Sequence, residues 1–188
     1  DGRGLLSTCM SLPQFSDIIA FEPDPEYFNT ASMQIESFFR QQAIKPRVTL
    51  VNAAVSTKGG KADFHITKNR ASSSLSPNGR SPEANDRTTS VECVVLYDYL
   101  MKKGIPYIDH YVSDIQGSDF SVLQTMKPYI NKKLIGSMFI ETQSDGTPQI
   151  YTGLENRLGD FKTLLEDSYF IESICGEYNP DTNTLERL

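Results

Sequence analysis

Short apolar runs alternate along this chain with longer segments in which apolar residues recur every three or four positions. Runs of roughly four to eight β-branched and aromatic residues are typical of buried strands, and the longer spacing is typical of amphipathic helices. Residues 18–21 therefore predict a strand. Residues 25–42 predict a helix, with Asp24 as its N-cap and Pro25 in its first turn. The apolar face of this helix would carry Phe28, Ala31, Ile35, Phe38 and Phe39.

The same alternation continues along the rest of the chain. Further helices are predicted over residues 5–10, 97–103, 118–129 and 154–167. Further strands of the main sheet are predicted over residues 48–55, 107–115, 134–141, 169–174 and 184–188. Strands that alternate with helices in this way favour a mostly parallel, doubly wound sheet with helices on both faces.

Residues 56–96 interrupt the alternation. Residues 61–67 and 90–96 alternate apolar and polar side chains, as strands with one solvent-exposed face do. Residues 69–89 between them are rich in Ser, Asn, Arg and Pro, which predicts a loop, and long loops inside domains are usually functional or disordered. We therefore expect a β-hairpin or loop insertion between the third and fourth strands.

The chain opens on the glycine-rich residues 1–4, which run straight into the predicted helix at 5–10. A glycine-rich turn that opens a helix normally follows a strand, so the first strand of the sheet is expected to be missing from the chain. A length of 188 residues is natural for one domain with a substantial core. The prediction is a single domain over residues 1–188 that is incomplete at its N-terminal side.

Composition and charge narrow the function classes. A net charge of −6 argues against a nucleic-acid partner held by phosphate contacts. No apolar run approaches the ~18 residues of a membrane span, and no secretory signal is visible. The three cysteines are far apart and the histidines number two, which argues against a disulfide framework or a metal site. A reducing, cytoplasmic location fits this cysteine content.

Polar side chains follow four of the predicted strands at the point where each strand ends. They are Glu22, Asn52, Asp114 and Glu141. The carboxyl ends of parallel strands share one edge of a sheet, and ligands bind at that edge in open α/β folds. A carboxylate such as Glu22 can accept both hydroxyl hydrogens of a ribose, although an acid that merely ends a strand and caps the next helix remains an equal alternative.

The other candidates also have structural alternatives. Asp114 is either a site acid or the N-terminal acid of a helix, and Glu141 is either a contact to a substrate or a solvated strand end. His110 is more typical of a packed or surface histidine than of a base, and His65 alternates within a strand that has an exposed face. On composition alone, residues 72–74 have the character of a linker.

Four motifs, taken in order, resemble those of FkbM-type methyltransferases. They are Phe21-Glu22-Pro23-Asp24-Pro25, Val51-Asn52-Ala53-Ala54-Val55-Ser56, Ser72-Ser73-Ser74-Leu75 and Ser113-Asp114-Ile115-Gln116-Gly117. The segment 91–100 is similar to the strand and turn that precede the fourth strand in that family. The resemblance spans about residues 1–175, and the order and spacing of the motifs carry it.

This resemblance implies a Rossmann-like class I fold that binds S-adenosylmethionine and transfers its methyl group to a hydroxyl of a small molecule or glycan. It implies that Glu22 takes the ribose hydroxyls and that Asp114 lies closest to the transferred methyl, with Glu141 as a second catalytic candidate. The remaining cofactor contacts implied are Asp1 and Gly2 from the glycine-rich loop, Asn52 and Ala53 near the adenine, and Ser73 and Ser74 on the insertion. No metal is implied.

The chain departs from the family pattern at a few positions. The fourth-strand motif has no lysine before Asp114, and Ser118-Asp119 stand where the family tends to have Ala-Glu.

Two other functions stay open on sequence alone. One is a cofactor-binding or interaction module without catalysis within a larger chain. The other is a nucleotide-dependent oxidoreductase of similar fold, whose glycine fingerprint would lie upstream.

Overall fold

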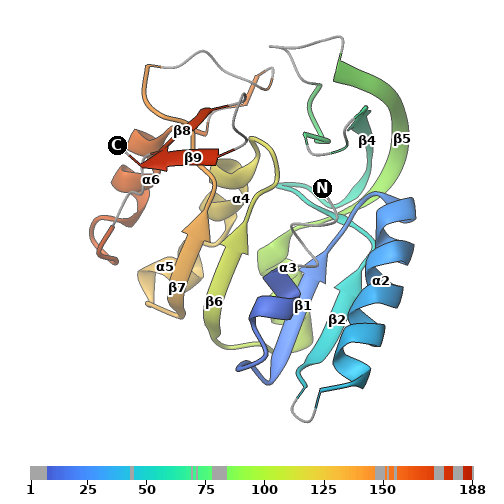
Figure 1. Cartoon of the computed structure of the whole chain (residues 1–188). Coiled ribbons are helices and arrows are strands. Elements are labelled where there is room, and N and C mark those ends of the chain that lie inside the picture. Colours follow the sequence, from blue (N-terminus) through green and yellow to red (C-terminus); the bar gives the residue numbers. More distant parts are fainter. Residues whose placement is uncertain are drawn as a thin grey trace.

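Two pairs of parallel strands form the centre of the molecule, shown in Figure 1 as a computed structural model. In one pair, β1 (Asp17–Phe21) lies beside β2 (Arg47–Val51), and in the other, β6 (Ile108–Ser113) lies beside β7 (Ile135–Ile140). The structure describes residues 8–42, 45–68, 70, 72–77, 84–146, 151, 153–154 and 156–171, and the main chain of 176–179 and 184–187. This is a mixed α/β fold, as the sequence predicts.

Helix α2 (Pro25–Arg40) covers the first pair of strands. Its start follows the prediction, because the carboxylate of Asp24 accepts the main-chain N–H of Glu26 at 3.0 Å and Pro25 supplies a helical φ in the first turn. Apolar spacing buries one face of the helix against the strands. That core contains Ala31, Ile35 and Phe39 from the helix and Ile18 and Ala20 from β1. Ahead of β1, residues 8–11 are helical, which confirms the last part of the helix predicted at 5–10.

The single strand predicted at 48–55 is two strands. β2 ends at Val51, and β3 (Ala54–Val55) pairs with the insertion instead of with β1. The break occurs because the N–H of Ala53 turns back to the carbonyl of Val51 at 3.0 Å. This turn directs the chain away from the first pair of strands and into the insertion.

The insertion is the expected antiparallel hairpin. β4 (Gly60–Thr67) pairs with β5 (Asn85–Val94), and the sheet order is β3-β5-β4. β5 begins at 85, earlier than the predicted 90, because its register against β4 continues past the alternating apolar residues. One face is buried by Phe64, Ile66, Val91 and Cys93, which is the reason for the alternation.

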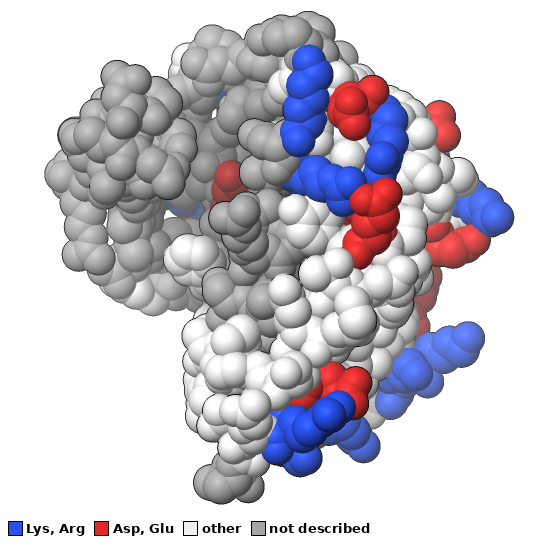
Figure 2. Space-filling model, turned by 45° about the vertical axis from the view of Figure 1, so that its right-hand side comes forward, with Lys and Arg blue, Asp and Glu red and all other residues white. Residues whose placement is uncertain are grey.

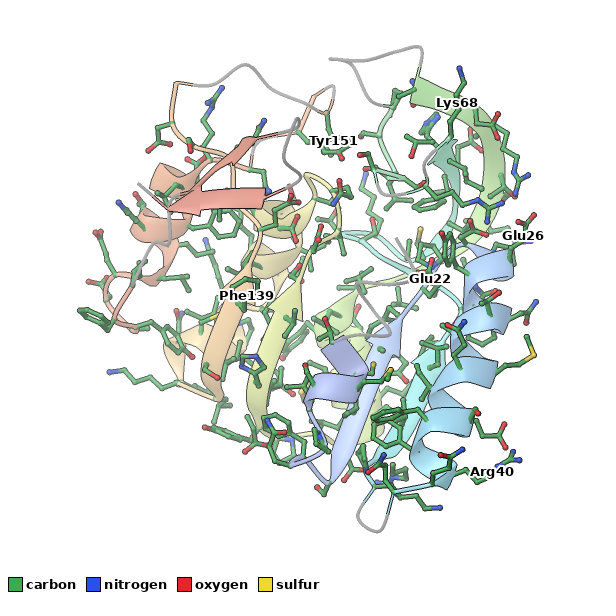
Figure 3. The ribbon with its side chains drawn as sticks, viewed as in Figure 1. Glu22, Glu26, Arg40, Lys68, Phe139 and Tyr151 are labelled. Carbon is green, nitrogen blue, oxygen red and sulfur yellow. The ribbon has the colours of Figure 1, made fainter. Side chains whose placement is uncertain are left out.

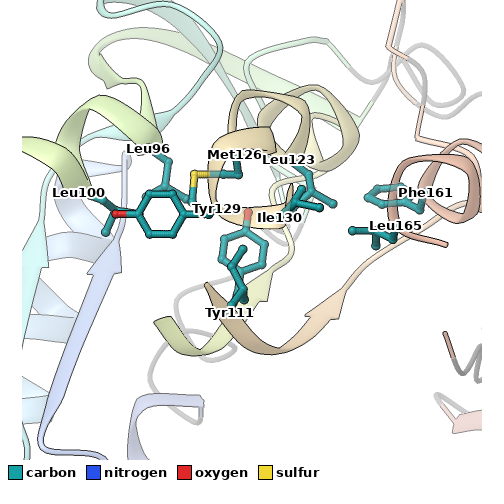
Figure 4. Packing of buried hydrophobic residues seen from close by; sticks show 10 residues of the cluster. Leu96, Leu100, Tyr111, Leu123, Met126, Tyr129, Ile130, Phe161 and Leu165 are labelled. Atoms are coloured by element: carbon teal, nitrogen blue, oxygen red, sulfur yellow. The ribbon is translucent and has the colours of Figure 1, made fainter. Parts of the chain in front are cut away.

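Four helices surround the core of the second pair of strands. They are α3 (Leu96–Lys103), α4 (Asp119–Thr125), α5 (Lys127–Asn131) and α6 (Leu158–Leu165). Figure 4 shows the buried side chains between them, with Leu123, Met126 and Ile130 fully buried at the centre. The helix predicted at 118–129 is broken between α4 and α5, because Pro128 has no N–H with which to continue the α4 hydrogen-bond pattern.

The C-terminal part differs most from the prediction. α6 begins at 158 instead of 154, because the chain before it pairs with the segment after β7. The main-chain N–H of Gln143 donates to the carbonyl of Asn156 at 2.7 Å, and the N–H of Leu158 donates to the carbonyl of Gln143 at 2.9 Å. Residues 169–171 are not a strand, and 172–174 lie outside the described residues. The strands found are β8 (Gly176–Asn179) and β9 (Thr184–Arg187), which pair antiparallel with each other and not with the parallel strands.

Candidate functional site

The carboxyl ends of β1, β2, β6 and β7 point toward the same edge of the molecule (Figure 1). The polar residues predicted to gather there form two separate groups. One group follows β1 and β2 and contains Glu22 and Asn52. The other follows β6 and β7 and contains Asp114 and Glu141. Figure 3 shows where Glu22 from the first group lies relative to Tyr151, which joins the second.

The first group is held by the Asn52 side chain. Its Nδ2 donates to the main-chain carbonyls of Glu22 at 2.8 Å and Pro23 at 3.2 Å. The N–H of Glu22 in turn donates to the carbonyl of Val51 at 3.0 Å. Asn52 therefore fixes the turn that presents Glu22, and the small Ala53 beside it is buried.

The Glu22 carboxylate is half-buried at the end of β1. Its Oε1 accepts the N–H of Asp24 at 2.9 Å, and among the described residues no hydrogen bond uses its Oε2. Burial raises the pKa of this carboxyl, and the Asp24 N–H opposes that rise. Among the described residues, Glu22 is thus a fixed hydrogen-bond acceptor with one carboxylate oxygen that makes no hydrogen bond.

The second group centres on Gln116. The amide nitrogen of Gln116 donates to Oδ1 of Asp114 and lies 3.4 Å from Oε2 of Glu141. The hydroxyl of Tyr151 donates to Oε1 of the same amide. The carboxyl groups that follow β6 and β7 are therefore bridged by one neutral side chain, which a tyrosine from a later segment contacts in turn.

Burial and the close packing of acidic side chains change the pKa values of residues in the second group. Glu141 as a whole residue is exposed, but its carboxyl group is desolvated. This desolvation raises the pKa of Glu141 to about 8, together with the charge of Asp114 and a hydrogen bond between the two carboxyl groups. The charge of Asp119 adds to the same effect. Desolvation also raises the pKa of Tyr151, and the nearby Glu141 contributes. Tyr151 is therefore a neutral hydrogen-bond donor at physiological pH.

Two buried polar residues support the turns that carry these groups. Asp119 accepts the Ser113 hydroxyl at 2.5 Å and the N–H of Ile115 at 3.2 Å, and burial raises its pKa. Its Oδ2 is buried without a partner in the described part of the chain. Asn156 accepts the N–H of Phe120 at 3.0 Å and donates to the carbonyl of Glu141 at 3.1 Å.

Sequence reasoning noted Asp119 as a departure from the family pattern and assigned no role to Gln116, Tyr151 or Asn156. For Gln116 the strand-end position was a usable signal. No local pattern marks Tyr151 or Asn156, since each acts on residues far away along the chain.

The insertion reaches the second group through Ser74. The main chain of Ser74 pairs with His65 at 2.8 and 3.0 Å, and its hydroxyl donates to the carbonyl of Gln116 at 2.9 Å. Ser73 instead faces the hairpin, where its hydroxyl accepts the N–H of Thr67 at 3.1 Å and donates to the carbonyl of Arg70 at 3.0 Å. Both serines thus bind the protein's own main chain.

The insertion also contacts α2 through Arg70. Its guanidinium pairs with Asp24 at 3.3 Å and with Glu26, and it lies 5.3 Å from the ring centre of Tyr27. Arg87 pairs with Glu26 at 2.7 Å. On the face shown in Figure 2, basic and acidic side chains are intermixed. The insertion is therefore fastened to the start of α2 and to the second group of strand-end residues.

The remaining candidates lie elsewhere. Asp1 and Gly2 fall outside the described residues. His110 lies within β6, stacked on Phe15 and hydrogen-bonded to Ser137 at 2.7 Å, and His65 contacts Thr88 at 3.3 Å on the hairpin. No cluster of three potential metal ligands is present in the part of the chain that the structure describes.

Two shallow surface hollows lie against α2, outside the strand-end groups. One is lined by Met10, Gln34 and Phe38, and the other lies between Phe39 and Val48. Neither is lined by a residue of the two groups, so the geometry of the strand ends, and not these hollows, defines the candidate site.

The family model described as the methyltransferase FkbM domain matches residues 8–170. The chain belongs to the FkbM methyltransferase family. The match covers both parallel pairs, the hairpin and all four strand-end residues. No curated protein and no solved structure matches the chain significantly. Among the described residues of this FkbM domain, no helix is long and apolar enough to cross a membrane.

Proposed function

We propose that this FkbM domain is an S-adenosylmethionine-dependent methyltransferase that acts on a hydroxyl oxygen of a small molecule or glycan. The observation that carries the proposal is the pair of carboxyl groups, Asp114 and Glu141, bridged at the ends of β6 and β7. Such a pair can accept the proton that a hydroxyl must lose when it is methylated. The family membership supports the reaction class.

We propose that the two parallel pairs belong to one Rossmann-like, doubly wound sheet within a single domain over residues 1–188. The pairs point the same way, and in Figure 1 α2 lies beside the β1–β2 pair while α4 and α5 lie near the β6–β7 pair. Among the described strands, β1 and β6 do not pair with each other. A further parallel strand between β1 and β6 would join the pairs.

The arrangement around Glu22 suits a nucleoside cofactor. Its Oε2, which no described residue contacts by a hydrogen bond, would accept a ribose hydroxyl, while Oε1 stays on the N–H of Asp24. Ala53 would lie against the adenine, because a methyl side chain leaves room for a flat ring, and Asn52 would hold the turn between them. Asp1 and Gly2 would contact the methionine part, and Ser73 and Ser74 would keep the insertion over the cofactor.

S-adenosylmethionine, when bound, supplies a methyl group on a positively charged sulfur. Asp114 would orient the acceptor hydroxyl and accept its proton as the oxygen forms its bond to the methyl carbon and the carbon–sulfur bond breaks. Glu141, with a pKa of about 8, would be largely protonated at neutral pH and would hydrogen-bond to Asp114.

Calorimetry and a transfer assay on the full-length protein test the proposal. We expect S-adenosylmethionine and its demethylated product to bind, and Asp114→Asn to keep binding while transfer falls by about 100-fold or more. Asp109→Asn is the matched control, because Asp109 is exposed near the other end of β6. If neither S-adenosylmethionine nor its demethylated product binds, the cofactor assignment is overturned.

Binding without transfer, tested on a panel of hydroxyl acceptors, would instead favour the cofactor-binding or interaction module without catalysis. Equal transfer by wild type and Asp114→Asn would show that Asp114 takes no part in the reaction.

The cytoplasmic location stays a prediction that rests on the cysteine content. In the described part of the chain, Cys9 and Cys93 are buried free thiols.

A further inference from the structure

Gln116 has a main-chain conformation that residues with a side chain rarely adopt. Its φ is +58°, in the left-handed region, and the next residue, Gly117, continues the turn at +94°. A left-handed residue other than glycine costs free energy and persists only where the surrounding structure holds it. Such a cost beside two carboxyl groups of the proposed site points to a task for the Gln116 side chain.

The contacts of Gln116 come from four separate segments. Its carbonyl accepts the Ser74 hydroxyl from the insertion, and its amide oxygen accepts the Tyr151 hydroxyl. Its amide nitrogen has two hydrogens and two acceptors, Asp114 Oδ1 and Glu141 Oε2. The Tyr151 contact fixes which end of the amide faces the acids, since the reversed amide would turn its oxygen toward two carboxyl groups.

We propose that Gln116 is a positioning residue, oriented by Tyr151, that holds the Asp114 and Glu141 carboxyl groups together and stabilises the ionised form of the pair. The proposal concerns the site described above, so its role in methyl transfer rests on the proposed function. The effect of Gln116 on the ionisation of the two acids does not rest on that function, because these hydrogen bonds are present without cofactor or acceptor.

The direction of the effect follows from the charges that face the pair. Asp119 from α4 and the pair's own mutual repulsion disfavour a second negative charge, and Tyr151 is neutral. The Gln116 amide donates to the carboxylates and so favours ionisation. Loss of that donor, or loss of its orientation, should raise the pH at which the pair releases its last proton. Because the two acids interact, the measured values belong to the pair.

Carboxyl ¹³C NMR titration of the folded protein tests this with two variants and their combination. Tyr151→Phe removes the hydroxyl that orients the amide and keeps the ring. Gln116→Asn shortens the side chain so that it no longer reaches both acids, and asparagine tolerates the left-handed conformation better than glutamine. The second variant therefore separates loss of the bridge from backbone strain.

We expect the upper apparent pKa of the pair to rise by about 0.5 to 1 unit in each single variant, which is the size of one solvent-screened hydrogen bond to a charged group. The double variant should match Gln116→Asn alone, because Tyr151 acts only through the amide. Unchanged titration in both single variants would overturn the proposal, and additive shifts would show that Tyr151 acts independently of Gln116.

Transfer kinetics separate this proposal from the proposed function. If the protein transfers methyl groups, the part of its pH–rate profile that reports release of the pair's last proton should move up with the NMR titration, while the dissociation constant of the cofactor stays within about twofold. A rate profile that does not follow the titration would mean that the bridge has no part in catalysis. If no transfer occurs, the proposed function fails, and the titration still decides whether Gln116 sets the ionisation of the pair.

Discussion

The hydroxyl of Ser74 donates a hydrogen bond of 2.9 Å to the carbonyl of Gln116, 42 residues further along the chain. Ser74 lies in the insertion, and Gln116 lies in the turn after β6. The bond is partly buried, and Ser74 itself is only 1% exposed. It fastens the insertion to the turn that carries Asp114.

Ser74→Ala removes the donor to Gln116 and the acceptor for the N–H of Ser76 at 3.2 Å. Because buried partners then remain unsatisfied, we expect the free energy of unfolding to fall by about 1–3 kcal/mol, measured by urea denaturation. Ser90→Ala on the exposed face of β5 is the control and should change it by less than about 0.5 kcal/mol. Equal stability of the two variants would contradict a stabilising role for the Ser74 contact.

Gly117→Ala adds a Cβ that would lie 2.6 Å from a ring carbon of Tyr151, at a φ of +94°. Backbone strain and this overlap should together lower the free energy of unfolding by about 2–4 kcal/mol. Gly146→Ala is the matched control, because Gly146 also has a positive φ, +83°, but a Cβ there meets nothing within 4 Å. The difference between the two variants in thermal or urea unfolding isolates the contact with Tyr151, and no difference would mean that the ring moves aside at no cost.

Glu22→Gln replaces a charged acceptor with a neutral amide at the end of β1. If Glu22 accepts a ribose hydroxyl, affinity for the demethylated cofactor product should fall by about 10- to 100-fold in calorimetry. Glu36→Gln, at an exposed residue of α2 that pairs with Arg40, provides the comparison. Affinities within twofold of wild type for Glu22→Gln would exclude this role.

Glu141→Gln should change how stability depends on pH. The folded pKa of Glu141 is raised from 4.5 to about 8, so the unfolded chain releases this proton first as the pH rises. The stability that the protonated group contributes is therefore complete below about pH 4.5 and is lost progressively toward pH 8. Urea denaturation across this range should show wild type losing stability relative to the variant. Parallel curves would mean that the carboxyl is not perturbed in the folded protein.

Much of the fold was accessible from local patterns. The start of α2 followed from Asp24 and Pro25, and the antiparallel hairpin followed from alternating residues on either side of a polar loop. Two of the misplaced boundaries depend on contacts outside the local segment, whereas the break between α4 and α5 follows from Pro128 within it. The break after β2 depends on Asn52 bonding to the turn after β1, and the late start of α6 depends on residue 156 pairing with Gln143.

The candidate site was partly accessible in the same way. Glu22, Asn52, Asp114 and Glu141 could be placed at strand ends, because a change from apolar to polar residues marks the end of a buried strand. Their division into two groups was not visible. A polar residue type says that a side chain can form hydrogen bonds, and only the packing of distant segments decides with which partner.

The sequence by itself determined the alternation of strands and helices, the hairpin and the family of this chain, because periodicity and capping act over a few residues and are written in their order. Only the tertiary structure decided that Gln116 lies between Asp114, Glu141 and Tyr151, with Ser74 behind it. Those contacts join segments far apart along the chain, and their geometry exists only once strand pairing and helix packing bring the segments to the same edge.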